Sequence, residues 1–206
     1  MEKGGFSHLD KKPSRRYLFL MSKAHQRRKQ PEVVRQQVLE VAARLSLQKG
    51  PASVTLDAVS QAAGVSKGGL LHHFPSKQAL LDGMFDDLVG KFGQAIDDEM
   101  ARHPAEAGRF TRAYLAVCFS PEHSGESDGW KTLVTALLAE PHLRQRWRLW
   151  AERQAERHAA TDGSVDAELV RFAVDGLWLS QLLDGAVPDP ERQRALMERL
   201  IALSRL

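Results

Sequence analysis

Residues 54–77, VTLDAVSQAAGVSKGGLLHHFPSK, decide the fold of this chain because they predict two short helices joined by a tight turn. Thr55 can accept a hydrogen bond from a first-turn amide, so the first helix is predicted to run from about Leu56 to Ala63. Apolar side chains recur along this helix at the spacing of one buried face. Gly64 follows where a helix end favours a residue with positive φ, which glycine adopts without a steric penalty.

The second helix of this stretch is predicted to begin after Ser66, its N-cap, and to end near His73. It ends there because Pro75 disfavours helical geometry in the residue before it. Ser76 then caps a third helix that begins with Lys77. A short helix, a glycine turn and a second short helix with small and polar residues describe a helix-turn-helix.

The positive charge of the chain is concentrated just before this motif. The formal net charge is +3, but residues 1–50 hold 12 Lys and Arg against 4 Asp and Glu, a net of +8. Residues 51–90 hold 2 against 4, and residues 91–206 hold 15 against 18. A basic segment beside a DNA-reading motif favours phosphate neutralisation. A flexible, solubilising basic tail is the equally weighted alternative for residues 1–30.

Helical spacing continues along the rest of the chain, so we expect an all-α fold of about nine helices. Pro31 is predicted to open a helix that ends at Lys49, and a long helix is predicted from Lys77 to about Arg102. Gly90 and Gly93 in the long helix suggest a bend or the close approach of another element. Further helices are predicted near residues 105–119, 127–139, 141–160, 165–184 and 190–204.

These elements predict a basic, flexible lead (1–30), a three-helix DNA-binding unit (31–78) and a C-terminal helical domain (79–206). No stretch has the length of a membrane span or the pattern of a signal peptide, so we expect a cytoplasmic protein without membrane contact. The single cysteine, Cys118, lies in an apolar context and is expected to be a small buried side chain.

The stretch from Thr55 to Leu81 resembles the DNA-binding signature of the TetR family of transcriptional regulators. The A-A-G-V-S turn, H-H-F and S-K-x-x-L-L carry the resemblance, which covers residues 35–85 well. It implies a homodimer whose DNA-binding units enter successive major grooves of a palindromic operator. It also implies that the C-terminal domain binds a small effector, whose identity the sequence leaves unknown, and that the output is repression by default.

The resemblance also implies the residues that touch double-stranded DNA. Base edges would be reached from the start of the second motif helix, where Lys67 could read a guanine or pair with a phosphate. The DNA backbone would be held by Thr55, His72 and Lys77. Two departures from the family pattern are Gly69, often threonine, and Leu71, often a tyrosine that contacts the DNA backbone. The expected DNA contacts are Thr55, Ser66, Lys67, Gly68, Gly69, Leu71, His72 and Lys77.

Large apolar side chains in the C-terminal domain are candidates for an effector pocket, although each is more often a plain core residue. The candidate pocket residues are Phe92, Met100, Phe119, Trp130, Trp147 and Trp150. The segment 169–184 is apolar on more than one face, which favours either a subunit interface or a central core helix. The candidate interface residues are Trp178, Leu182, Leu196 and Leu200.

A metal enzyme is the competing class, since the chain has 8 histidines. None of them pairs with another at i, i+4 beside a glutamate, and no cysteine cluster, phosphate loop or nucleophile elbow accompanies them. We therefore expect no enzyme activity, no metal and no cofactor. A transcriptional activator and a sequence-neutral architectural DNA binder of the same fold remain as alternatives.

Overall fold

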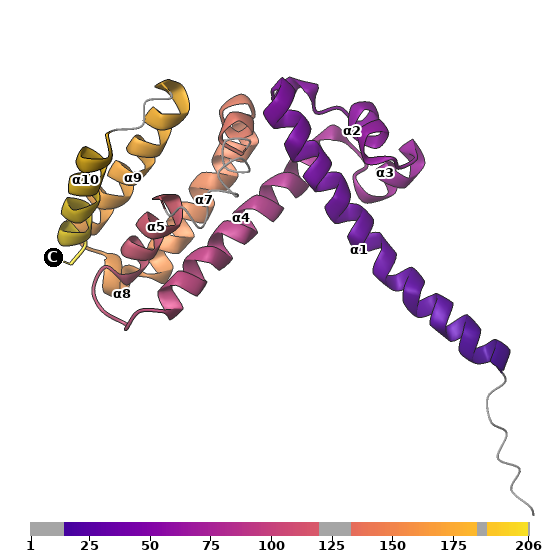
Figure 1. Ribbon diagram of the computed structural model, residues 1–206, viewed down its shortest axis with the longest axis horizontal. Coiled ribbons are helices and arrows are strands. Elements are labelled where there is room, and N and C mark those ends of the chain that lie inside the picture. Colours follow the sequence, from indigo (N-terminus) through magenta and orange to yellow (C-terminus); the bar gives the residue numbers. More distant parts are fainter. Residues whose placement is uncertain (1–14, 120–132, 185–188, 206) are drawn as a thin grey trace, which may run out of the picture.

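The chain folds into helices that form an N-terminal motif and a larger C-terminal bundle (Figure 1). The computed structural model describes residues 15–119, 133–184 and 189–205, with the backbone alone for residues 15–30 and 181–184. In addition to a helical stretch at 133–139, the elements are α1 (Arg15–Lys49), η1 (Pro51–Ser53), α2 (Leu56–Ala63), α3 (Lys67–His73), α4 (Lys77–Ala101), α5 (Arg109–Phe119), α7 (Pro141–Arg157), α8 (Ala159–Asp162), α9 (Val165–Asp184) and α10 (Pro190–Leu203).

The structure corrects the predicted start of the first helix. α1 begins at Arg15, with Pro31 inside it, and its N-terminal half points away from the rest of the molecule (Figure 1). An internal proline removes one backbone hydrogen bond, but the residues around it are mostly good helix formers such as Lys, Arg, Gln and Leu. Residues 15–30, expected to be a flexible lead, are therefore helical, whereas residues 1–14 lie outside the described part.

The C-terminal half of α1 packs across α2, α3 and the start of α4. Val38, Val59 and Leu70 are fully buried and contribute one apolar side chain from each of α1, α2 and α3 to a shared core. Burial of a single such side chain stabilises a fold by about 1.5–3 kcal/mol. The three helices are thereby held as one unit.

α4 leaves this unit and runs along the C-terminal bundle beside α5, so it belongs to both parts (Figure 1). Near its start, Gly83 lies against the DNA-binding unit: a Cβ there would be 2.7 Å from Cε1 of Phe74 and 3.3 Å from Cδ2 of Leu39. Further along, Phe92 and Ile96 are buried in the C-terminal bundle. The helix therefore joins two packed regions without a break.

In the C-terminal bundle, two predicted helix boundaries shift. α5 begins at Arg109, later than predicted, after Gly108, whose φ is 71°. The helix predicted over 141–160 divides at His158 into α7 and α8. Asp162, 2 % exposed, accepts hydrogen bonds from the backbone N–H groups of Phe110 (3.2 Å) and Thr111 (2.7 Å), so α8 caps the first turn of α5.

Among the helices that the structure describes, none is both long enough and apolar enough to cross a lipid bilayer.

Candidate nucleic-acid interface and effector pocket

The caps of the helix-turn-helix form as the sequence predicts. Oγ1 of Thr55 accepts a hydrogen bond from the N–H of Ala58 at 3.1 Å, and Oγ of Ser66 accepts one from the N–H of Gly69 at 3.1 Å. Gly64 adopts the left-handed conformation between them, with a φ of 67°. These local interactions fix the turn that sets α3 against α2.

α3 is buried on one side and exposed on the other. Leu70 and, just after the helix, Phe74 are buried at 0 % and 2 % exposure, and the guanidinium of Arg35 lies 5.3 Å from the centre of the Phe74 ring. Gln37 of α1 donates a hydrogen bond to the carbonyl of Ala63 at 3.0 Å. All of the expected DNA contacts are exposed: Thr55, Ser66, Lys67, Gly68, Gly69, Leu71, His72 and Lys77.

Lys67, at the start of α3, is paired within the protein. Its Nζ lies 2.8 Å from Oδ1 of Asp57 on α2, and both side chains are mostly exposed. Sequence reasoning did not single out Asp57, because the two residues lie on different helices and no helical spacing relates them. An acceptor for the Lys67 ammonium is therefore already present on the reading surface.

Lys77 lies at the first position of α4, which is capped by Ser76. Oγ of Ser76 accepts a hydrogen bond from the N–H of Ala79 at 3.0 Å. An exposed lysine at a helix N-terminus presents positive charge together with the partial positive charge of the helix end. This arrangement suits a phosphate group.

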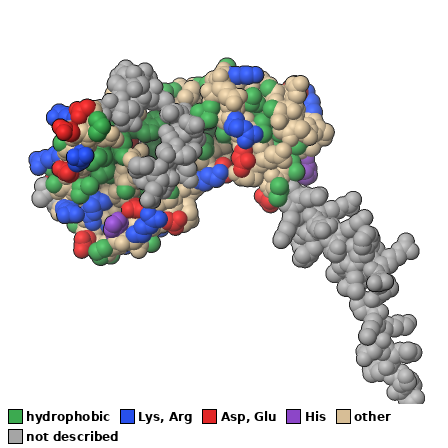
Figure 2. Space-filling model, viewed as in Figure 1, with side chains coloured by type: hydrophobic (Ala, Val, Ile, Leu, Met, Phe, Trp, Pro, Cys, Tyr) green, Lys and Arg blue, Asp and Glu red, His purple; other side chains and the backbone are tan. Residues whose placement is uncertain are grey.

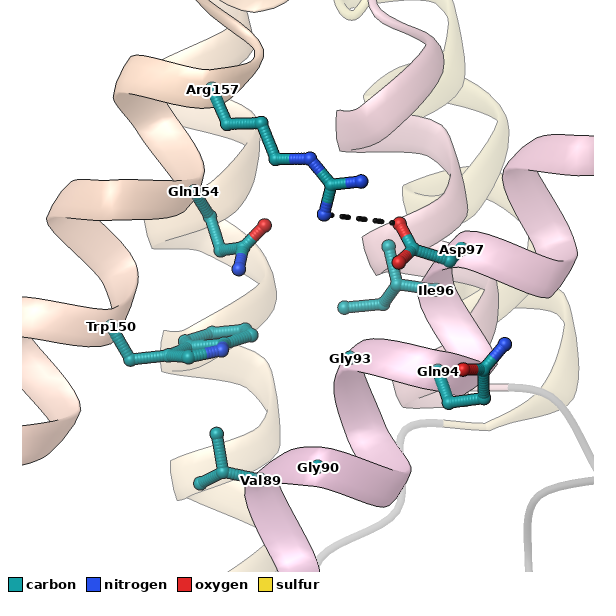
Figure 3. A pocket seen from close by; sticks show the side chains of 9 residues that line it. All are labelled: Val89, Gly90, Gly93, Gln94, Ile96, Asp97, Trp150, Gln154 and Arg157. Carbon is teal, nitrogen blue, oxygen red and sulfur yellow. Dashed lines mark ion pairs between the residues drawn. The ribbon is translucent and has the colours of Figure 1, made fainter. Parts of the chain in front are cut away.

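A pocket of about 300 Å³ lies between α4 and α7 in the C-terminal domain (Figure 3). We call it the α4–α7 pocket. Its lining residues are Val89, Gly90, Gly93, Gln94, Ile96, Asp97, Trp150, Gln154 and Arg157. Its volume is at the lower end of the range for small-molecule sites.

Of the predicted pocket residues that the structure describes, Trp150 lines this pocket and the others do not. Phe92 and Trp147 stand behind it: their ring centres lie 5.6 and 4.9 Å from that of Trp150. Met100 and Phe119 are half-buried against the core, and Trp130 lies outside the described residues. The polar and glycine residues of the pocket were not predicted as such, because they come from two helices about 60 residues apart.

The pocket contains one ion pair between its own walls. An Nη atom of Arg157 lies 3.5 Å from Oδ1 of Asp97, and the pair bridges α7 and α4 (Figure 3). Both side chains are more than a third exposed, so the pair contributes little to stability. It leaves the lining close to neutral overall.

A second set of contacts joins α7 to the part of α4 next to the DNA-binding unit. Arg146 pairs with Asp82 at 2.9 Å and with Asp86 at 2.5 Å, and its guanidinium lies 4.6 Å from the centre of the Phe85 ring. His142 contacts the same Asp82 at 3.4 Å. The wall of the pocket that carries Trp150 is thus attached to the first turns of α4.

The DNA-binding unit and the C-terminal domain each match a known protein family. Residues 38–84 match the family described as bacterial regulatory proteins, tetR family, and residues 108–205 match the tetracyclin repressor-like C-terminal domain. The chain is 31 % identical to the transcriptional repressor KstR2 of Rhodococcus jostii, over 71 % of this chain and 77 % of that protein. The chain belongs to the TetR family.

Solved structures agree with this assignment. The multidrug binding protein EbrR complexed with malachite green has a TM-score of 0.64 at 23 % identity, covering 84 % of this chain and 98 % of that one. The same protein complexed with ethidium gives a TM-score of 0.57 at 27 % identity, covering 81 % and 97 %. As a TetR-family protein, this chain is a DNA-binding transcriptional regulator and not an enzyme.

This TetR-family chain exposes an apolar row along α9. Val165, Leu169, Phe172 and Leu179 are 72, 55, 63 and 38 % exposed, at a spacing that keeps them on one side of the helix. We call these four residues the α9 row. Figure 2 shows hydrophobic side chains at the surface among charged ones at the end of the molecule formed by α9 and α10.

The four predicted interface residues differ in their surroundings. Trp178 and Leu196 are half-buried, whereas Leu200 is 8 % exposed and packs in the core of the single chain. The side chain of Leu182 lies outside the described residues. The exposed apolar surface of α9 therefore comes mainly from the α9 row, of which Leu169, Phe172 and Leu179 lie in the apolar segment 169–184 that the sequence had pointed to.

Titratable groups between α5 and α9 form a separate cluster. The hydroxyl of Tyr114 donates to Oδ1 of Asp175 at 2.5 Å. Burial raises the pKa of Asp175 above its usual value. Burial and, to a smaller extent, the nearby Asp175 carboxylate also raise the pKa of the Cys118 thiol. Cys118 is thus a thiol rather than a reactive thiolate. The described residues contain no group of three or more His, Cys, Asp or Glu that could hold a metal ion.

Proposed function

We propose that this chain is a transcriptional repressor that binds a palindromic operator as a homodimer and leaves it when a small effector binds. The carrying observation is the division of α3 into a buried side at Leu70 and an exposed side that holds the expected DNA contacts. Its similarity to KstR2, a protein described as a transcriptional repressor, supports the sign of regulation.

In this proposal Ser66 to Gly69 approach base edges in the major groove. Gly68 and Gly69 carry no side chain, so they let the backbone of α3 come close to the bases, and Leu71 offers apolar contact to a thymine methyl group. Thr55, His72 and Lys77 hold the phosphate backbone on either side. The exposed surface of these residues and the helix N-terminus at Lys77 support the assignment.

We further propose that residues 1–30 add phosphate contacts. Residues 15–30 continue α1 beyond the DNA-binding unit as a helix, and the segment is rich in Lys and Arg. Removing residues 1–30 is expected to weaken operator binding and to flatten its salt dependence, because each phosphate contact releases counterions. An unchanged affinity and salt slope would contradict this role.

The α9 row supports a homodimer. Four large apolar side chains on one side of a helix are costly to leave in water, and a second copy of the same surface is self-complementary around a two-fold axis. A dimer of this kind would present two copies of α3 to two half-sites.

The effector in this proposal occupies the α4–α7 pocket. Occupancy would change the spacing of α4 and α7, and α4 leads directly to Lys77 and the reading helix. The effector would then favour an arrangement of the two reading heads that does not fit the operator. EbrR, which is similar in fold, is described as a multidrug binding protein and was solved with ethidium.

Genome-wide mapping of bound DNA in the host cell, combined with deletion of the gene that encodes this chain, tests the proposal. We expect the recovered sites to share a palindrome and transcription of the adjacent genes to rise in the deletion strain. A fall in their transcription would indicate an activator. Sites without a common sequence would indicate an architectural DNA binder.

A further inference from the structure

Two glycines of the α4–α7 pocket have no packing reason to be glycine. Gly90 and Gly93 lie inside α4, where a glycine is less favourable than alanine. A Cβ added to either would meet nothing within 4 Å, and neither has a positive φ. The close approach of another element, one of the two readings suggested by the sequence, therefore does not explain them. Their effect is to leave a bare strip of helix backbone.

The bare strip is opposed by an aromatic ring. In Figure 3 the indole of Trp150 extends from α7 toward Gly90 and Gly93. Trp150 is only 9 % exposed, and the rings of Phe92 and Trp147 pack against it, at centre distances of 5.6 and 4.9 Å. The ring therefore holds one orientation. The side-chain-free helix surface and the edge of this fixed indole face each other across the pocket (Figure 3), which leaves a narrow gap suited to a flat molecule.

The remaining lining residues limit the charge of that molecule. Asp97 and Arg157 are paired with each other, so the lining carries no unbalanced charge that would attract an ionic ligand. Gln94 donates to Asp98 at 2.8 Å, whereas the Gln154 amide extends into the pocket (Figure 3). Val89 and Ile96 supply apolar edges.

We propose that the α4–α7 pocket binds an uncharged, planar aromatic molecule of two or three rings, inserted between the edge of Trp150 and the backbone at Gly90 and Gly93 and hydrogen-bonded to Gln154. A volume of about 300 Å³ accommodates a ligand of this size. This inference names the chemical class of the proposed effector. It rests on the proposed function in one respect, which is that the molecule in the pocket is the effector.

Three naphthalenes of equal ring size and different charge test the proposal by isothermal titration calorimetry on the full chain: 2-naphthamide, 2-naphthoate and 2-naphthylmethylammonium. Gly93→Leu places a side chain in the gap between Trp150 and α4, at a position where an added Cβ meets nothing within 4 Å. Lys91→Leu is the matched control, because it adds the same side chain to the same helix outside the pocket lining. Circular dichroism confirms that both variants fold.

We expect the wild type to bind 2-naphthamide more tightly than either charged compound. We expect Gly93→Leu to lose at least tenfold in affinity for it and Lys91→Leu to retain it. Equal binding by Gly93→Leu, tighter binding of a charged naphthalene, or no binding of the amide would each overturn the proposal. Operator affinity, measured separately with and without 2-naphthamide, distinguishes failure of effector release from failure of the binding site.

Discussion

At the scale of single residues, the charge on the reading surface is partly balanced within the protein. The Lys67 ammonium lies 2.8 Å from the Asp57 carboxylate, and both groups are exposed. Such a pair contributes at most about 1 kcal/mol to stability, so its main consequence is electrostatic. Lys67 meets DNA with an acidic partner beside it, and that partner also repels phosphate.

Replacing Asp57 by asparagine is expected to strengthen DNA binding. The amide keeps the shape of the side chain, frees Lys67 for a phosphate and removes a repulsive charge, so the salt slope should steepen by about 1. Fluorescence anisotropy over a range of salt concentrations measures both quantities. An unchanged slope would mean that Lys67 does not reach a phosphate, and Lys67→Met should then leave the salt slope unchanged as well.

His158 gives the C-terminal domain a pH dependence. Its ring stacks on that of Phe110 at 4.5 Å, its Nε2 is buried without a hydrogen-bond partner among the described residues, and burial lowers its pKa below the usual 6.5. A lowered pKa favours the neutral ring in the folded state. This stabilisation is present above the unfolded pKa and is lost as the pH falls below it.

Wild-type protein should therefore lose more unfolding free energy than His158→Phe when the pH is lowered from about 7.5 to about 5. Phenylalanine keeps the stack on Phe110 but does not titrate. Urea denaturation at the two pH values measures the difference. Equal losses in both proteins would show that His158 does not titrate in the folded state at a lowered pKa.

At the scale of elements, α4 has glycines with opposite roles. Gly83 is required by packing, since an added Cβ would lie 2.7 Å from Phe74, whereas the space over Gly90 is open. Gly83→Ala is expected to destabilise the protein by about 1–3 kcal/mol through overpacking and to weaken DNA binding. Gly90→Ala should stabilise it by up to about 1 kcal/mol through helix propensity.

Thermal and urea unfolding of the two alanine variants measure the change in unfolding free energy, which should be opposite in sign for Gly83→Ala and Gly90→Ala. Operator affinity should fall for Gly83→Ala alone, because Phe74 follows the reading helix directly. A stabilising effect at Gly83 would mean that Phe74 can move aside without cost. The close packing of Gly83 on Phe74 would then not hold α3 in place against α4.

The elements also show which features the sequence could predict. The caps at Thr55, Ser66 and Ser76 depend on residues three positions apart, so local chemistry was sufficient. The predicted start of α1 was wrong because Pro31 was taken as the first residue of the helix, although the residues before it also favour a helix. Helix boundaries in the C-terminal domain depended on tertiary contacts such as the Asp162 cap, which no local pattern reveals.

The candidate sites divide in the same way. The exposed DNA contacts follow from a short motif whose geometry is local. The α4–α7 pocket depends on the relative placement of two helices, and Phe92 and Trp147, two of the aromatic residues favoured by the sequence, pack against Trp150 behind it. Gln154 and Arg157 carry no distinguishing pattern in an Arg- and Gln-rich helix, so only the fold identifies them as lining residues.

At the scale of the whole molecule, the α9 row predicts assembly. Phe172→Glu places a charge at the centre of the proposed interface, and Phe172 is 63 % exposed, so the single chain should still fold. We expect sedimentation velocity to show a dimer for the wild type and a monomer for this variant, with greatly weakened operator binding. Glu168→Gln is the control on an exposed neighbouring position. A dimer that persists in Phe172→Glu would place the interface elsewhere.

The central claim is that the exposed side of α3 reads a DNA sequence. The most direct measurement is the ratio of affinities of the purified protein for its mapped site and for the same bases in shuffled order, at one salt concentration near physiological. A sequence reader should prefer its site by roughly 1,000-fold or more. A ratio close to one would contradict the claim and leave only sequence-neutral binding to the phosphate backbone.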